Sequence, residues 1–204
     1  MTGASSPPKT LLIACGALAR EMLALIEANR WGHMTLECLP AKLHNRPEKI
    51  PDAVRGKIAG ARGRFDRIFV AYADCGTGGL LDKVLAEEGV ERIGGPHCYS
   101  FYAGATPFEA LHEEELGSFY LTDYLARHFE TLIIKGMGLD RFPQLMEAYF
   151  GNYRRLVYLA QTEDVELVEK AKAAAKRLGL DYEYRLTGYG ELTDFMTRAA
   201  GEQE

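Results

Sequence analysis

Three of the four cysteines in this 204-residue chain follow short apolar segments at points where the chain turns. Cys15 ends the segment TLLIAC, Cys75 lies in DCGTGG, and Cys98 ends the segment GGPHC. Thiolates and imidazoles are the ligands that zinc prefers, and three protein ligands leave one coordination position open for chemistry. We therefore predict a zinc-like metal site formed by Cys75 and Cys98, with Cys15, His44 and His97 as supporting ligands.

The spacing of these residues leaves other interpretations open, because the chain contains neither CxxC nor HxxxH. Cys75 is alternatively the nucleophile of a metal-free enzyme, with its thiol pKa lowered at the start of a helix. Asp74 is then either an acid or base of that reaction or a cap of the loop. In the third interpretation the cysteines are small apolar fillers, and Cys38, inside a strand-like segment, is expected to lie in the core.

Glycines and tyrosines near these cysteines suggest that a ligand binds there. Gly76 and Gly78 lie at a turn between a strand and a helix, where backbone N–H groups can hold an anion or cofactor. The loop matches neither a Walker loop nor GxGxxG. The tyrosines either form the wall of a pocket for a planar ligand or fill the core. The tyrosines considered for this pocket are Tyr99, Tyr102, Tyr120, Tyr149 and Tyr153. Asp123 is either a site residue or, with Thr122, a helix cap.

Strand-like and helix-like segments alternate along the chain, which predicts an α/β fold. It would have a largely parallel sheet covered by helices on both faces, as one domain or as two similar lobes. The strands are expected at residues 10–15, 35–39, 67–73, 90–93, 118–121, 155–159 and 182–186. Helices are expected over residues 18–29, from Pro51 onward, at 80–88, over residues 125–132 and from about Glu191, together with a long helix capped by Thr162 and ended by Gly179. Because ligands bind at the carboxyl ends of such strands, Cys15, Cys75 and Cys98 are expected to meet there.

The domain organisation predicted from the sequence is simple. Residues 1–9 are expected to form a disordered leader, and residues 199–204 a disordered tail. One α/β domain spans residues 10–198, with 10–116 and 117–198 as its candidate sub-lobes. No linker rich in proline or serine divides it.

The composition excludes several classes of protein. With 47% hydrophobic residues, 26% charged residues and a net charge of −5, the chain is globular and has no basic surface for nucleic acid. No apolar run approaches the roughly 20 residues of a membrane-spanning helix, so no membrane partner is expected. Four cysteines are too few for a disulfide framework, which favours a reducing, cytoplasmic location. The oligomeric state is not indicated.

Several motifs together resemble a known family. They are LLIACGALAREM, KLHNRPEKIP, YADCGTGGL, GPHCYSFYAG and SFYLTDYLARHF. The set is similar to the family designated domain of unknown function 1638, from about Thr10 to about Tyr189. The family's Cys-Gly turn corresponds to Cys75 and Gly76, and its later cysteine to Cys98. Many relatives have His-Asp-Cys there, whereas this chain has His97 directly before the cysteine.

The resemblance implies a metabolic context, because such proteins often accompany corrinoid-dependent methyl-transfer systems. A corrinoid protein or a methyltransferase is therefore an expected partner. The chain lacks the DxHxxG motif of corrinoid carriers, so a corrinoid is expected only through that partner. We predict a metal-binding or small-ligand-binding protein of one-carbon metabolism, acting as a methyltransferase or beside one. The alternatives are a metal-free cysteine enzyme and a non-catalytic module that binds a methyltransferase.

Overall fold

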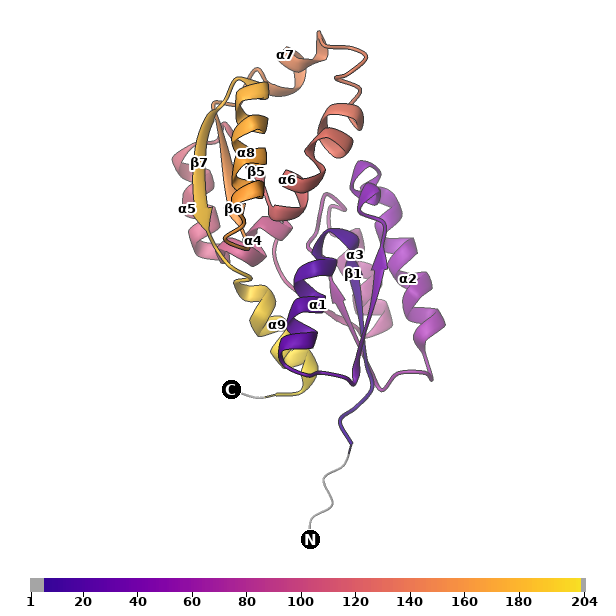
Figure 1. Cartoon of the computed structure of the whole chain (residues 1–204). Coiled ribbons are helices and arrows are strands. Elements are labelled where there is room, and N and C mark those ends of the chain that lie inside the picture. Colours follow the sequence, from indigo (N-terminus) through magenta and orange to yellow (C-terminus); the bar gives the residue numbers. More distant parts are fainter. Residues whose placement is uncertain (1–5, 203–204) are drawn as a thin grey trace. The chain divides into compact units, whose positions relative to one another are not determined.

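A computed structural model describes residues 6–202, and in it the chain forms two compact units, each built on a parallel sheet (Figure 1). The expected α/β fold class is confirmed. Unit 1 contains the described residues up to Cys98 and those from Glu191 onward, and unit 2 is residues 99–190. The division differs from the candidate sub-lobes 10–116 and 117–198, because the last helix returns to the first unit.

Unit 1 contains a four-stranded parallel sheet with the order β2-β1-β3-β4. Its strands are β1 (Thr10–Cys15), β2 (Met34–Leu39), β3 (Arg67–Ala71) and β4 (Glu91–Arg92). All six residues of β1 are buried, as expected for a central strand of a parallel sheet with helices on both faces. This burial explains why its sequence is continuously apolar rather than alternating.

The helices of unit 1 cover both faces of this sheet. They are α1 (Ala19–Ala28), α2 (Ile50–Ala61), α3 (Leu80–Glu88) and α9 (Glu191–Ala200). Helix α1 packs with α9, and α2 packs with α3. Across the sheet, β2 lies on one side of β1 and β3 on the other, so the connection from β1 to β2 runs in the opposite direction to that from β2 to β3. Because such connections are right-handed, their helices α1 and α2 lie on opposite faces of the sheet. The strand order therefore reverses between β1 and β3, which is a topological switch point.

Unit 2 contains a three-stranded parallel sheet with the order β5-β6-β7. Its strands are β5 (Ser118–Leu121), β6 (Arg155–Ala160) and β7 (Asp181–Leu186). The helices are α4 (Cys98–Ala103), which begins at the last residue of unit 1, α5 (Ala105–Glu114), α6 (Asp123–Phe129), α7 (Leu145–Phe150) and α8 (Val165–Leu178). A π-helical segment, Glu130–Lys135, follows α6.

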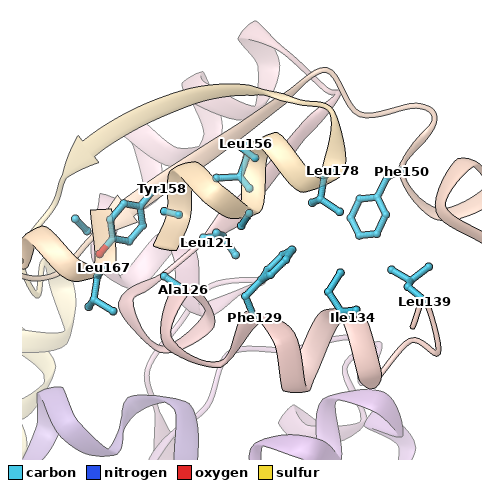
Figure 2. Close-up of a cluster of buried hydrophobic side chains, with 14 residues drawn as sticks. Leu121, Ala126, Phe129, Ile134, Leu139, Phe150, Leu156, Tyr158, Leu167 and Leu178 are labelled. Atoms are coloured by element: carbon cyan, nitrogen blue, oxygen red, sulfur yellow. The ribbon is translucent and has the colours of Figure 1, made fainter. Parts of the chain in front are cut away.

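The main core of unit 2 lies between one face of its sheet and the helices α6 and α8. Figure 2 shows Phe129 and Ile134 in the lower part of this core, with Leu156 and Leu178 above them. The opposite face of the sheet packs against Phe108 and Leu111 of α5. Consecutive strand residues point to opposite faces, so Val157 joins the α5 side while its neighbours Leu156 and Tyr158 join the main core.

The structure corrects several expectations about individual residues. Cys38 is exposed rather than in the core, because β2 is an edge strand in which only the first and last residues, Met34 and Leu39, are buried. Asp164, not Thr162, caps α8 by accepting from the N–H groups of Glu166 and Leu167. The sequence interpretation did not include α4, α5 and α7.

The chain ends are also more ordered than expected within the described residues. Residues 1–5 of the expected leader and 203–204 of the expected tail lie outside them. The N–H of Lys9 donates to the Asp66 carboxylate at 2.8 Å, and Ala199 and Ala200 are buried in α9. Among residues 6–202, no helix is long and apolar enough to cross a membrane.

Candidate functional site

The candidate site lies at the carboxyl ends of β1 and β3, next to the switch point of unit 1. Ala14 of β1 pairs with Ala71 of β3, so the next residues, Cys15 and Tyr72, leave the sheet side by side. Both residues are buried. Burial and the neighbouring Cys15 thiol raise the pKa of the Tyr72 hydroxyl, which keeps it protonated. The edge therefore presents a neutral hydroxyl beside a thiol.

His44 completes this part of the site from the loop that follows β2. Its Nδ1 lies 3.8 Å from the Cys15 sulfur and 2.9 Å from the Ala41 carbonyl oxygen. Donation from Nδ1 to that carbonyl leaves Nε2 as the nitrogen with a free lone pair. The imidazole stacks on the Tyr72 ring with centroids 6.2 Å apart. Because His44 is exposed, the site is open to solvent on this side.

Cys75 lies in the loop after β3, which is tied to the loop after β4. The N–H of Asp74 donates to the Gly95 carbonyl at 3.1 Å, and the N–H of Cys75 donates to the Pro96 carbonyl at 3.0 Å. These bonds bring Cys75 and Cys98 to the same edge. Cys75 also has a positive φ of 49°, a left-handed conformation that costs a non-glycine residue about 1–3 kcal/mol and is common at functional sites.

The carboxylate of Asp74 holds the DCGTGG loop closed. It accepts from the Thr77 hydroxyl at 2.7 Å and from the N–H groups of Gly78 and Gly79 at 3.2 and 2.9 Å. The Thr77 hydroxyl and then the Gly79 N–H lower the pKa of Asp74, so it is ionised at neutral pH. This geometry favours the capping alternative for Asp74. The N–H of Gly78 is used within the loop, and Gly76 has a φ of 83°, at a point where a side-chain Cβ would lie 3.6 Å from Pro47.

The pKa values of the Cys15, Cys75 and Cys98 thiols are all raised. Burial raises the pKa of Cys15 to about 11. Burial and then the charge of Cys15 raise the pKa of Cys75 to about 12. Cys98 is shifted in the same direction by burial and then by the charges of Cys75 and Cys15. All three thiols are therefore protonated at neutral pH.

This result corrects the expectation that a helix start lowers the thiol pKa of Cys75. Helix α3 begins at Leu80 with Gly79 as its N-cap, so its positive end is too far along the chain to stabilise the thiolate. Burial dominates instead and disfavours the charged form. The metal-free nucleophile therefore loses the feature on which it depended.

The predicted metal ligands are neighbours at one edge, but they do not form a closed site. Within residues 6–202, no group of three or more His, Cys, Asp or Glu side chains is placed so that it could hold a metal ion. Cys15, Cys75 and Cys98 share the edge with His44. His97 is exposed, and the Cys15 sulfur lies 3.8 Å from Nδ1 of His44.

Comparison with known families identifies the chain. The family model described as a protein of unknown function, DUF1638, matches residues 38–196, which is more than half of the chain. The chain belongs to the DUF1638 family. The resemblance seen in the motifs is thus confirmed, and the match includes Cys75 and Cys98, whereas Cys15 precedes it. No curated protein matches the sequence.

The tyrosines of this DUF1638 protein do not form one pocket wall. Tyr99 and Tyr120 pack together in unit 2, with ring centroids 5.6 Å apart, and Tyr102 is buried. Tyr153 packs instead on Phe119, whose side chain lies on the other face of β5 from Tyr120. Tyr149 is exposed. The core-filling alternative therefore describes Tyr99, Tyr102 and Tyr120.

The sequence interpretation missed two residues of the candidate site. Tyr72 was treated as part of a buried strand, although a tyrosine directly after such a strand has a hydroxyl that can reach the edge of the sheet. Glu21 is buried in α1, and its charge contributes to the raised pKa of Cys98. The sequence signal for Glu21 is a carboxylate directly before Met22 on the apolar face of the helix.

Another hollow in unit 1 of the DUF1638 protein lies away from the cysteines. It has a volume of about 730 Å³ and is lined by residues that include Arg67, Glu91, Asp194 and Arg198. Arg67 is the first residue of β3, so this hollow lies at the amino ends of the strands. In sheets of this type ligands bind at the opposite edge, which makes the cysteine edge the better candidate site.

Proposed function

We propose that this DUF1638 protein binds a zinc-like metal ion at the carboxyl edge of the unit 1 sheet. Cys15, Cys75 and Cys98 would be its ligands, with His44 as the fourth. The observation that supports this proposal is the position of Cys15 and Cys75. They follow the two strands between which the strand order reverses, where open α/β sheets bind their ligands.

The donor chemistry of these side chains fits such an ion. Thiolates and imidazole are zinc ligands, and a metal replaces the thiol protons that burial retains in its absence. A cysteine side chain moves by rotation about a single torsion, and such rotations would have to bring the three sulfurs onto the ion. His44, whose Nδ1 is directed to the Ala41 carbonyl, has the orientation that metal-binding imidazoles commonly show.

The surrounding residues supply the other features of a ligand site. The hydroxyl oxygen of Tyr72 is buried without a well-formed hydrogen bond among the described residues, and such a group needs a ligand, a water or an ion as its partner. Asp74 keeps the loop of Cys75 closed. Tyr72 would therefore donate to a bound ligand, while Asp74 holds Cys75 in its left-handed conformation.

The wider role that we propose is methyl transfer in or beside corrinoid-linked one-carbon metabolism. Its support is the family resemblance, which implies such a context. A thiol acceptor would replace His44 in the fourth coordination position, and the zinc ion would hold it as its thiolate once its proton is lost. The protein would act as a methyltransferase or as an accessory to one, in the cytoplasm, and would meet the corrinoid through a partner protein.

Metal analysis of the purified, reduced protein tests this proposal. We expect about one zinc ion per chain after incubation with zinc and removal of the excess, and loss of this ion in Cys75→Ser and Cys98→Ser. Cys38→Ser is the matched control, because Cys38 is exposed, and it should retain the ion. A folded double variant, Cys75→Ser with Cys98→Ser, that keeps the ion would contradict the proposal. A wild-type protein that binds no zinc would contradict it as well.

The methyl-transfer role has its own test. Methylcobalamin, free or on a corrinoid protein, would be mixed with a small thiol, and demethylation followed by its visible absorbance. The zinc-loaded protein should accelerate this reaction, and Cys75→Ser should abolish the acceleration. A zinc-loaded protein that leaves the rate unchanged, both as an enzyme and as an addition to a corrinoid methyltransferase, would contradict this role while leaving the metal site intact.

A further inference from the structure

The outer edge of the unit 2 sheet is a six-residue strand that has a pairing partner on one side. Strand β7 is last in the order β5-β6-β7 and pairs with β6 in parallel from Asp181 to Leu186. We infer that β7 pairs antiparallel with β7 of a second copy of this chain, so that two three-stranded sheets join across a two-fold axis. This inference is independent of the proposed metal site.

The backbone of β7 presents hydrogen-bonding groups at the free edge. The N–H of Asp181 donates to the Arg154 carbonyl and that of Thr187 to the Ala160 carbonyl, so odd-numbered residues are directed toward β6. Backbone direction alternates along a strand, and Tyr182, Tyr184 and Leu186 therefore direct their N–H and C=O groups outward.

This edge lacks several of the features that prevent pairing, and its charged side chains are of both signs. Proteins protect edge strands with proline, charged side chains (especially lysine), bulges or short length. The sequence DYEYRL contains neither proline nor lysine and forms an unbroken ladder with β6. Tyr184 and Leu186 are 40% and 52% exposed, so the edge also offers apolar surface for a partner to bury.

The charges of β7 select one register for self-pairing. In a two-fold pair centred on Tyr184, Glu183 lies opposite Arg185 of the partner subunit, and this pair occurs twice. Centring on Glu183 would place that carboxylate opposite its own copy, and centring on Arg185 would do the same for the guanidinium. Opposite charges in facing positions stabilise a sheet and like charges destabilise it. Pairing centred on Tyr184 therefore has complementary charges.

The same register is complementary in its backbone and on its two faces. Outward-directed residues then face each other in three pairs, which would form about six backbone hydrogen bonds. On one face Tyr184 meets its own copy, and Tyr182 meets Leu186 of the partner subunit. On the other face Glu183 already accepts from Arg155 at 3.0 Å and from Arg185 at 2.5 Å. The intersubunit pairs would extend this ion-pair network across the axis.

The molar mass in solution, measured by light scattering and by sedimentation, tests the inference. The wild-type protein should have twice the chain mass of 22.7 kDa. Tyr184→Pro removes an outward N–H at the centre of the pair and leaves the ladder to β6 intact, so this variant should be a monomer. Tyr184→Thr is its matched control, because it retains the N–H and should still dimerise, with lower affinity.

Charge exchange provides a second test that does not depend on proline. Arg185→Glu creates two like-charge pairs and should weaken dimerisation about tenfold or more. Combining it with Glu183→Arg restores complementary pairs and should recover the dimer. Lys172→Glu, an equal change of charge on the exposed side of α8, should have no effect. Circular dichroism confirms that each variant is folded.

Two outcomes would overturn the inference. The first is a wild-type protein that is monomeric at every concentration measured, which would show that β7 does not pair with a second copy of this chain. The second is a dimer that persists at wild-type affinity in both folded variants, Tyr184→Pro and Arg185→Glu, which would place the interface elsewhere.

Discussion

The buried carboxyl group of Asp123 offers a sharp test of how unit 2 is held together. Asp123 is 1% exposed at the end of β5. Its Oδ1 accepts from the Tyr158 hydroxyl at 2.7 Å and from the Gln161 N–H at 3.0 Å, and its Oδ2 accepts from the Thr162 hydroxyl at 2.6 Å. Thr122 caps α6, so the role of Asp123 is to join the ends of β5 and β6.

The cost of removing this group follows from the donors that it would leave behind. Asp123→Ala leaves the buried Tyr158 hydroxyl and the buried Gln161 N–H without an acceptor, at about 1–3 kcal/mol each. We therefore expect the free energy of unfolding to fall by about 4 kcal/mol. Asp123→Asn keeps one acceptor, and its amide can donate to the Thr162 oxygen, so it should lose about 1–2 kcal/mol.

Urea unfolding followed by far-ultraviolet circular dichroism measures these changes. The only tryptophan, Trp31, lies in unit 1, so its fluorescence follows that unit separately. Asp140→Ala is the control, since Asp140 is an exposed carboxylate of the same unit and should change stability by less than about 0.5 kcal/mol. In a double-mutant cycle, Tyr158→Phe should recover part of the loss in Asp123→Ala. An Asp123→Ala protein within 1 kcal/mol of the wild type would refute this reasoning.

Three further predictions concern single side chains. The rate of alkylation of Cys75 in the metal-free protein should rise about tenfold per pH unit from about pH 8 to 11, because the pKa of Cys75 is raised to about 12. The exposed Cys38 should react first. Mass spectrometry after timed quenching measures both rates, and a plateau for Cys75 near pH 8.5 would contradict the burial argument. Asp74→Ala should speed hydrogen exchange at the Gly79 N–H at least about tenfold, because this N–H loses its acceptor. Unchanged protection of Gly79 would contradict the role of Asp74 in holding the loop. Asp164→Ala should lower stability by about 1 kcal/mol in urea, because it removes the cap of α8, and an unchanged midpoint would show that the cap is dispensable.

Local sequence patterns were sufficient to predict much of the fold. The strand Thr10–Cys15 and the helix Leu80–Glu88 occur as expected, because apolar runs and flanking glycines act over a few residues. Gly89 adopts the positive φ that the C-terminal ends of helices favour. The same patterns predicted that Cys15 and Cys75 lie at one edge of the sheet, because parallel strands end at the same edge.

Features that depend on contacts distant in sequence could not be predicted in this way. Thr162 and Asp164 are both good caps, and the choice between them depends on Asp123, which binds the Thr162 hydroxyl. The stacking of His44 on Tyr72 depends on two separate loops. The thiol pKa of Cys75 depends on its burial, and backbone hydrogen bonds join its loop to the loop after β4, which lies about 20 residues further along the chain.

X-ray absorption at the zinc edge of the zinc-loaded protein tests the central claim most directly. The proposed ligands predict a sulfur shell of three atoms at about 2.3 Å and one nitrogen at about 2.0–2.1 Å. Cys98→Ser should lower the sulfur count by one, while Cys38→Ser should leave the spectrum unchanged. A shell of nitrogen and oxygen atoms alone, or a sulfur shell that persists when Cys15, Cys75 and Cys98 are all replaced by serine, would contradict the claim.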